Sequence, residues 1–128
     1  MGEQNGILHR RIADFAAAVL RFVRRLPGEL AADAIVGHLA RSAAGIGANY
    51  RAASLARSRQ DIIAAARVAL EQAEETDRWL WMAMQLNVGN AQELALLARE
   101  ARELRAALTA YVSAARTRPE TSGRNRPL

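Results

Sequence analysis

The sequence contains no cysteine and no lysine, and it has only two residues each of Phe, Tyr and Trp. Without cysteine the chain can form neither a disulfide nor a thiolate metal site. Its two histidines, His9 and His38, provide few nitrogen ligands, so we expect no metal and no cofactor. Neither histidine has a nucleophile or an acid at a readable spacing, so we also expect no catalytic residue.

Long apolar runs are absent as well. The first apolar stretch is interrupted by Arg10, Arg11 and Asp14, which fits neither a signal peptide nor a membrane span. We therefore expect a cytoplasmic protein that has no membrane partner. The 128 residues correspond in length to one domain that can bury a core.

Alanine is the abundant residue, with 29 copies. It has the highest intrinsic helix propensity, so the composition favours helices. Helices with such small side chains are thin and pack closely, which leaves little room for a substrate pocket. The composition therefore indicates an all-α protein that is not an enzyme.

Four amphipathic segments, at about 7–26, 30–53, 58–87 and 90–116, predict four helices. Ser58 and Asn90 are suited as N-caps because an acid follows each of them three residues later. In each segment, apolar or small residues recur at alternating spacings of four and three, as in helical bundles. The predicted inward seams are Leu8, Ile12, Phe15, Val19, Phe22 and Leu26; Ile35, Leu39, Ser42, Ile46, Asn49 and Ala53; Ile62, Ala66, Ala69, Ala73, Thr76, Leu80 and Ala83; and Leu94, Leu97, Ala101, Leu104, Leu108 and Tyr111.

The connections between the segments are short, so sequential helices should pack as antiparallel neighbours. The predicted fold is an all-α, antiparallel up-down-up-down four-helix bundle over residues 1–116. Residues 117–128 contain two prolines, a glycine and no apolar residue before Leu128. We expect this segment to be a disordered basic tail.

Several residues are candidates for fixing the bundle register or an oligomer interface. Polar residues on a buried seam are costly unless they are hydrogen-bonded, and they can set register or oligomer state. Glycine inside a helix costs about 1 kcal/mol relative to alanine, which suggests a close helix approach. Two tryptophans flank Leu80 and point to opposite sides, so one lies outside the bundle, at an interface or under arginine stems. These candidates are Ser42, Gly45, Gly47, Asn49, Trp79 and Trp81.

All 18 basic residues are arginines, and they cluster. Arginine clusters with few acids are typical of surfaces that track phosphates, although they also occur as solvated faces that keep a protein soluble. No base-reading motif and no aromatic platform is visible, so binding should be to backbone or shape. The acidic run Glu71, Glu74, Glu75 and Asp77 is interpreted as a salt-bridged surface. The predicted nucleic-acid-binding residues are Arg10, Arg11, Arg21, Arg24, Arg25, Arg41, Arg51, Arg57 and Arg59.

The stretch 41–51, RSAAGIGANYR, resembles the signature of the four-helix bundle family encoded in 23S rRNA intervening sequences. Residues 56–62, 69–76, 79–80 and 100–104 are similar to the same family, which in turn is similar to the accessory variability determinant of diversity-generating retroelements. The resemblance implies a basic, barrel-like homopentamer that binds RNA or DNA and has no known catalysis. The chain departs from the pattern at Gly45, where serine is usual, and at Ala52, where glutamate is usual. It also departs at Glu71-Gln72, where a Lys-Glu pair is usual, and at Arg78, where tyrosine is usual.

Two functional hypotheses follow. The first is a homo-oligomeric bundle, pentameric by the resemblance, that binds RNA or DNA as an accessory to an RNA or retroelement process, with a reverse transcriptase as a potential partner protein. The second is a protein-interaction or scaffold module without a direct nucleic-acid role. The second rests on a stripe of small residues that could seat another helix: Ala40, Ala44, Gly47, Ala48 and Ala52.

Overall fold

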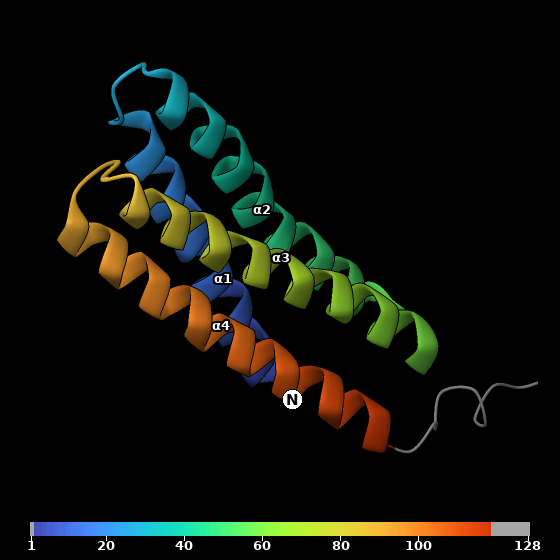
Figure 1. Ribbon diagram of the computed structural model, residues 1–128. Helices are drawn as coiled ribbons and strands as arrows, with labels where there is room; N and C mark the ends of the chain where they lie inside the picture. The colour runs from blue at the N-terminus through green and yellow to red at the C-terminus, as the bar shows by residue number, and fades with distance from the viewer. Residues whose placement is uncertain (1, 119–128) are drawn as a thin grey trace, which may run out of the picture.

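The computed structural model describes residues 2–118, with the side chains of residues 6–30 and 32–118. Four helices make up this part of the chain, which contains no strand: α1 (Gly2–Arg24), α2 (Leu30–Leu55), α3 (Arg59–Gln85) and α4 (Ala91–Thr117). They run alternately up and down, with the α1–α2 and α3–α4 connections at one end and the α2–α3 connection at the other (Figure 1). Each helix packs against its two neighbours around the bundle. The predicted all-α four-helix architecture is confirmed.

The helix ends differ from the predicted bounds by a few residues. α1 begins five residues earlier than expected and ends at Arg24, just before the Pro27-Gly28 break. At the start of the expected tail, Thr117 is the last residue of α4 and Arg118 is its C-cap. Residues 119–128, the rest of the predicted tail, lie outside the described residues.

Two of the helix starts have the predicted N-caps. The Ser58 hydroxyl accepts a hydrogen bond from the backbone N–H of Asp61 at 3.1 Å, and the Asn90 Oδ1 accepts one from the N–H of Glu93 at 2.8 Å. Each bond satisfies a backbone donor that has no partner inside its helix. The two caps therefore define where α3 and α4 begin.

The turn between α3 and α4 requires glycine at position 89. Gly89 has a φ of +85°, a left-handed conformation that L side chains rarely adopt. A Cβ atom built there would lie 2.5 Å from Cζ of Phe22, which is a buried residue of α1. The turn therefore packs directly on α1, and no larger residue fits at its Gly89 position.

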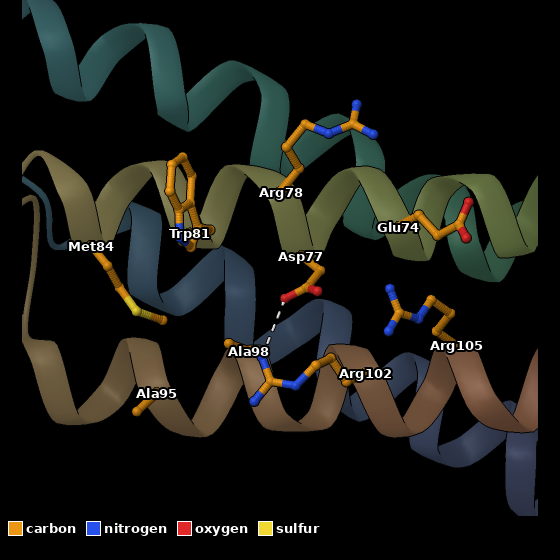
Figure 2. Close-up of a pocket in the computed structure, with 9 residues that line it drawn as sticks. All are labelled: Glu74, Asp77, Arg78, Trp81, Met84, Ala95, Ala98, Arg102 and Arg105. Atoms are coloured by element: carbon orange, nitrogen blue, oxygen red, sulfur yellow. Dashed lines mark ion pairs between the residues drawn. The ribbon is translucent and has the colours of Figure 1, made fainter.

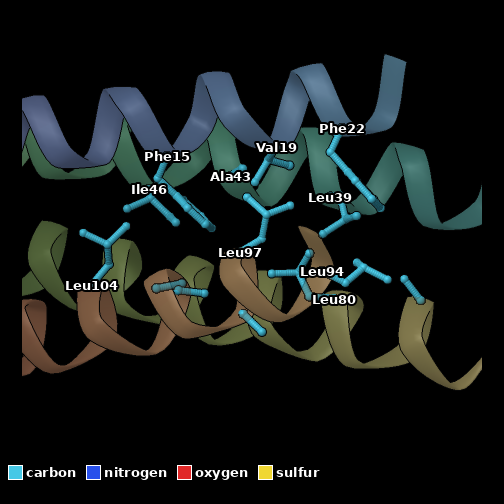
Figure 3. Packing of buried hydrophobic residues seen from close by; sticks show 14 of the residues in the cluster. Phe15, Val19, Phe22, Leu39, Ala43, Ile46, Leu80, Leu94, Leu97 and Leu104 are labelled. Carbon is cyan, nitrogen blue, oxygen red and sulfur yellow. The ribbon is translucent and has the colours of Figure 1, made fainter. Parts of the chain in front are cut away.

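The core lies between the α1–α2 pair and the α3–α4 pair (Figure 3). The predicted seams of α1 and α3 are buried, apart from partly exposed residues at their ends. On α2 the prediction that Asn49 faces the core is wrong, because Tyr50 is fully buried and Asn49 is only half-buried. A straight helix has 3.6 residues per turn and drifts from a strict heptad, so the spacing after Ile46 is four rather than three.

Tyr50 fills the end of the bundle near the start of α1. Its ring meets the ring of Tyr111 edge-on at 5.2 Å and that of His9 at 4.5 Å. Burial raises the pKa of Tyr50 to about 12, with a smaller contribution from Tyr111. No helix in the described part of the chain combines the length and apolar character needed to cross a membrane.

Candidate nucleic-acid interface

The outer sides of α1 and α2 carry exposed arginines that form no ion pair with another described residue. They are Arg10, Arg21 and Arg24 of α1 and Arg41 and Arg51 of α2. Arg21 and Arg24 follow Arg10 by about three and about four helical turns, so all three share one side of α1. The α1 arginines therefore form a stripe along the helix.

Contacts between α1 and α2 show which of these arginines lie at the same height along the bundle axis. A Cβ on Gly47 would lie 3.4 Å from Cγ2 of Ile12, so these two positions stand opposite each other in the antiparallel pair. Counting from this contact at about 1.5 Å per residue brings cations from both helices to the same levels, within one turn. The pairs at matching levels are Arg10 with Arg51 and Arg21 with Arg41.

The charge of the bundle is unevenly distributed. α3 carries five acids, at positions 61, 71, 74, 75 and 77, against three arginines. The described outer residues of α1 and α2 include only Asp14 and Asp33 as acids. The excess positive charge therefore lies on the α1–α2 side of the molecule. A surface that tracks phosphates requires clustered positive charge of this kind.

Two of the predicted arginines, one in α1 and one directly after it, form ion pairs with α4 instead. Arg11 donates to Glu100 at 2.8 Å and to Glu103 at 3.1 Å, and Arg25 forms an ion pair with Glu93. The hydrogen bond to Glu100 raises the pKa of Arg11, although partial burial opposes the shift. A phosphate at Arg11 or Arg25 would have to displace a carboxylate, so these two residues are less available than the α1–α2 arginines.

The two remaining predicted arginines lie in or next to the α2–α3 connection. Arg57 is exposed within that connection. Arg59 begins α3, and its Nη2 donates a hydrogen bond to the backbone carbonyl of Arg118 at the end of α4. The prediction thus joined residues from three different places in the fold.

Residues Ser42 and Gly45, expected to set register or an oligomer interface, lie inside the α2–α3 contact. The Ser42 side chain is buried, and its hydroxyl forms a 2.8 Å hydrogen bond with Thr76 Oγ1. At Gly45, an added Cβ would lie 2.8 Å from Oε1 of Gln72. Gly45 therefore makes room for the Gln72 side chain.

Asn49 and Trp79 also belong to the chain's own packing. Asn49 Nδ2 donates to the Gly45 carbonyl one turn earlier at 2.7 Å. Trp79 stacks on the ring of His38 with centroids 3.9 Å apart and planes 5° apart, and it packs against the core. Of the two tryptophans, Trp81 is the outward one, with 55% of its surface exposed.

His9 and Ser54 form a pair that the spacing of the sequence does not reveal. The Nε2 of His9 lies 2.9 Å from the Ser54 hydroxyl, across the α1–α2 contact. That hydroxyl donates its proton to the Tyr50 carbonyl at 3.0 Å, so the histidine is the donor in the pair. The pair therefore links α1 to α2.

A groove of about 680 Å³ runs between α3 and α4 (Figure 2). Trp81, Met84, Ala95 and Ala98 form its apolar end. Its charged end contains Glu74, Asp77, Arg78, Arg102 and Arg105, and Arg102 lies 3.6 Å from the Asp77 carboxylate. In the part of the chain that the structure describes, no three His, Asp or Glu residues gather closely enough to hold a metal ion.

The family model of the 23S rRNA-intervening sequence protein matches residues 5–110. The chain belongs to this family. Among solved structures, it is similar to a protein of unknown function from the S23 ribosomal protein family of Bacteroides thetaiotaomicron. The two share 24% identity over 85% of this chain and 97% of that chain, with a TM-score of 0.79. At this identity the likeness shows the fold alone, and none of the curated proteins matches the chain.

Proposed function

We propose that this family member is a non-enzymatic, homo-oligomeric bundle that binds RNA or DNA through the outer sides of α1 and α2. The observation that carries the proposal is the set of five exposed arginines on these helices, which have no carboxylate partner among the described residues. Guanidinium groups that are not engaged in intramolecular ion pairs can contact phosphates bidentately. The family's name, which refers to a sequence inserted in 23S rRNA, supports a nucleic-acid role.

Binding of this kind is driven by counterion release and should weaken steeply with salt. We expect the slope of log K against log salt to become shallower by about 0.9 for each phosphate contact that is removed from a duplex. The triple variant Arg21→Gln, Arg24→Gln, Arg41→Gln tests this with fluorescence anisotropy of labelled duplex RNA and DNA at several salt concentrations.

A matched control removes the same charge from elsewhere. The triple variant Arg67→Gln, Arg99→Gln, Arg116→Gln takes three exposed arginines from α3 and α4. It has the same net charge as the first variant, so a purely global charge effect would weaken both equally. Equal slopes for the two variants, or no binding by the wild type at low salt, would reject the proposed surface.

Assembly with further copies is the second part of the proposal. Ala44, Ala48 and Ala52 form an exposed stripe on α2, on the same outer side as Arg41, which lies one turn before the stripe. A stripe of small residues lets another helix approach closely, with Arg41 at the edge of that contact. Gly47 faces Ile12 of the same chain, so a substitution there would disturb the bundle rather than report on assembly. Ala48→Arg instead adds a bulky charge to the stripe.

Light scattering measures the mass directly. Five chains of 13.9 kDa would give about 70 kDa for the wild type, and Ala48→Arg should shift the mass toward one chain. The same stripe supports the alternative of a scaffold that binds another protein. A monomeric wild type that retains a protein partner after nuclease treatment would favour that alternative.

A further inference from the structure

The α3–α4 groove lies on the side of the bundle opposite to the α1–α2 arginines, because the α3–α4 pair packs against the α1–α2 pair across the core. It combines an exposed indole, a small apolar surface and cations within one depression (Figure 2). None of these groups contributes to the proposed α1–α2 surface. The groove is therefore a second, separate candidate for ligand binding.

Trp81 gives the groove a flat aromatic surface. Its side chain is 55% exposed and makes no ring contact with another described aromatic residue. Trp79, in contrast, is already stacked on His38. A half-exposed indole is suited to stack with a planar heteroaromatic ring, since every nucleobase presents a π-face.

The cations follow at a suitable distance along α4. The Asp77–Arg102 ion pair shows which residues of the two antiparallel helices are level, and by this register Trp81 lies opposite Ala98. Arg102 and Arg105 then lie about 6 and about 10 Å further along the axis. Figure 2 shows Arg105 reaching from α4 toward α3, whereas the guanidinium of Arg78 is directed away from α4. Arg102 and Arg105 are therefore the groove cations that we expect to contact a phosphate attached to a ring at Trp81.

The acids in the groove affect how strongly an anion binds there. The Asp77–Arg102 pair is long, at 3.6 Å, and its side chains are 22% and 53% exposed, so a phosphate that contacts Arg102 competes with the Asp77 carboxylate. Glu74 forms no ion pair with another described residue and lies level with Arg105. It should repel an anion bound there, and its neutralisation should strengthen binding.

We propose that this groove binds a nucleotide, with its base stacked on Trp81 and its phosphate held by Arg102 and Arg105. The nucleotide is either one unit of a single strand or a free mononucleotide, since both present the same ring and phosphate. The strand-bound form rests on the proposed nucleic-acid function and adds contact with an unpaired base to it. The free form is independent of that function.

Tryptophan fluorescence tests the site, with Trp81→Phe as the blank that retains only Trp79. The probes are adenosine 5′-monophosphate and single-stranded hexa-adenylate, with adenosine as the probe that lacks phosphate. We expect saturable quenching that is absent in Trp81→Phe, about ten-fold weaker in Arg105→Gln and stronger in Glu74→Gln. Arg99→Gln, an exposed position on the same helix outside the groove, is the matched control and should bind like the wild type.

The outcomes separate the sources and the two proposals. Quenching by hexa-adenylate alone assigns the site to a strand, and quenching by the monophosphate assigns it to the free nucleotide as well. The α1–α2 triple variant should keep the monophosphate response even where it loses duplex binding, so either proposal can fail alone. Absence of saturable quenching by both probes at low salt, in variants whose circular dichroism is unchanged, overturns the site. Equal weakening in Arg99→Gln and Arg105→Gln overturns it too.

Discussion

The buried hydroxyl pair between α2 and α3 allows a sharp test of the packing. Thr76 Oγ1 lies 2.8 Å from both the Ser42 hydroxyl and the Gln72 carbonyl, whereas Ser42 has only a 3.5 Å contact to the Leu39 carbonyl besides Thr76. The two hydroxyls are therefore not equivalent. Thr76 keeps a good acceptor if Ser42 is lost, but Ser42 keeps almost none if Thr76 is lost.

The magnitudes follow from this asymmetry. Thr76→Val retains the shape of the side chain but strands a buried hydroxyl, which costs about 1–3 kcal/mol. Ser42→Ala removes the other partner and leaves Thr76 satisfied, so we expect a loss of about 0.5–1 kcal/mol. The double variant Ser42→Ala, Thr76→Val contains no stranded group and should be more stable than Thr76→Val alone.

Urea denaturation followed by far-ultraviolet circular dichroism measures the four free energies of unfolding. All four proteins should be compared at one protein concentration, because self-association would make the apparent stability concentration-dependent. The result that would refute the reasoning is a double variant that is less stable than Thr76→Val. That order would mean that the two hydroxyls act independently and that Ser42 finds another acceptor.

Three further predictions concern separate parts of the bundle. Gly89→Ala should lower stability by about 2–3 kcal/mol in thermal unfolding, because φ is +85° and the new Cβ would collide with Phe22. Burial raises the pKa of Tyr50 to about 12, so the tyrosine loses its proton less readily in the folded than in the unfolded protein. The free energy of unfolding should therefore fall as pH rises from about 10 to about 12. Tyr50→Phe should flatten that part of the pH profile in denaturant titrations. Arg11→Gln should cost under about 1 kcal/mol, and less at high salt, since Arg11 and Glu100 are both about one-third exposed; a larger loss in a salt series would show that the pair is better shielded.

Local patterns were sufficient to predict the helices. The N-caps at Ser58 and Asn90 depend on residues three positions apart, and the seams depend on spacing within one helix. The seam of α2 failed at Asn49 because a strict heptad was extended past Ile46, where the straight helix turns Tyr50 inward instead. An error of one residue in a seam of this length leaves the fold class unaffected.

Contacts between distant helices could not be read in the same way. Arg11 and Arg25 belong to a basic cluster in the sequence, yet their partners Glu100 and Glu93 lie on α4. Only the register of α1 against α4 reveals those pairs. The groove at Trp81 likewise needs the α3–α4 register, although the flanking of Leu80 by two tryptophans did indicate that one of them is exposed.

The packing of the α3–α4 turn on Phe22 has a consequence for fusion and loop insertion. The two connections at that end of the bundle differ, since a Cβ at Gly28 in the α1–α2 connection would meet no atom within 4 Å. Extra residues, an epitope or a split-reporter fragment should be accepted around Gly28, where the chain borders open solvent. The same insertion next to Gly89 would move the turn away from α1 and expose the ring of Phe22, which is buried beneath that turn.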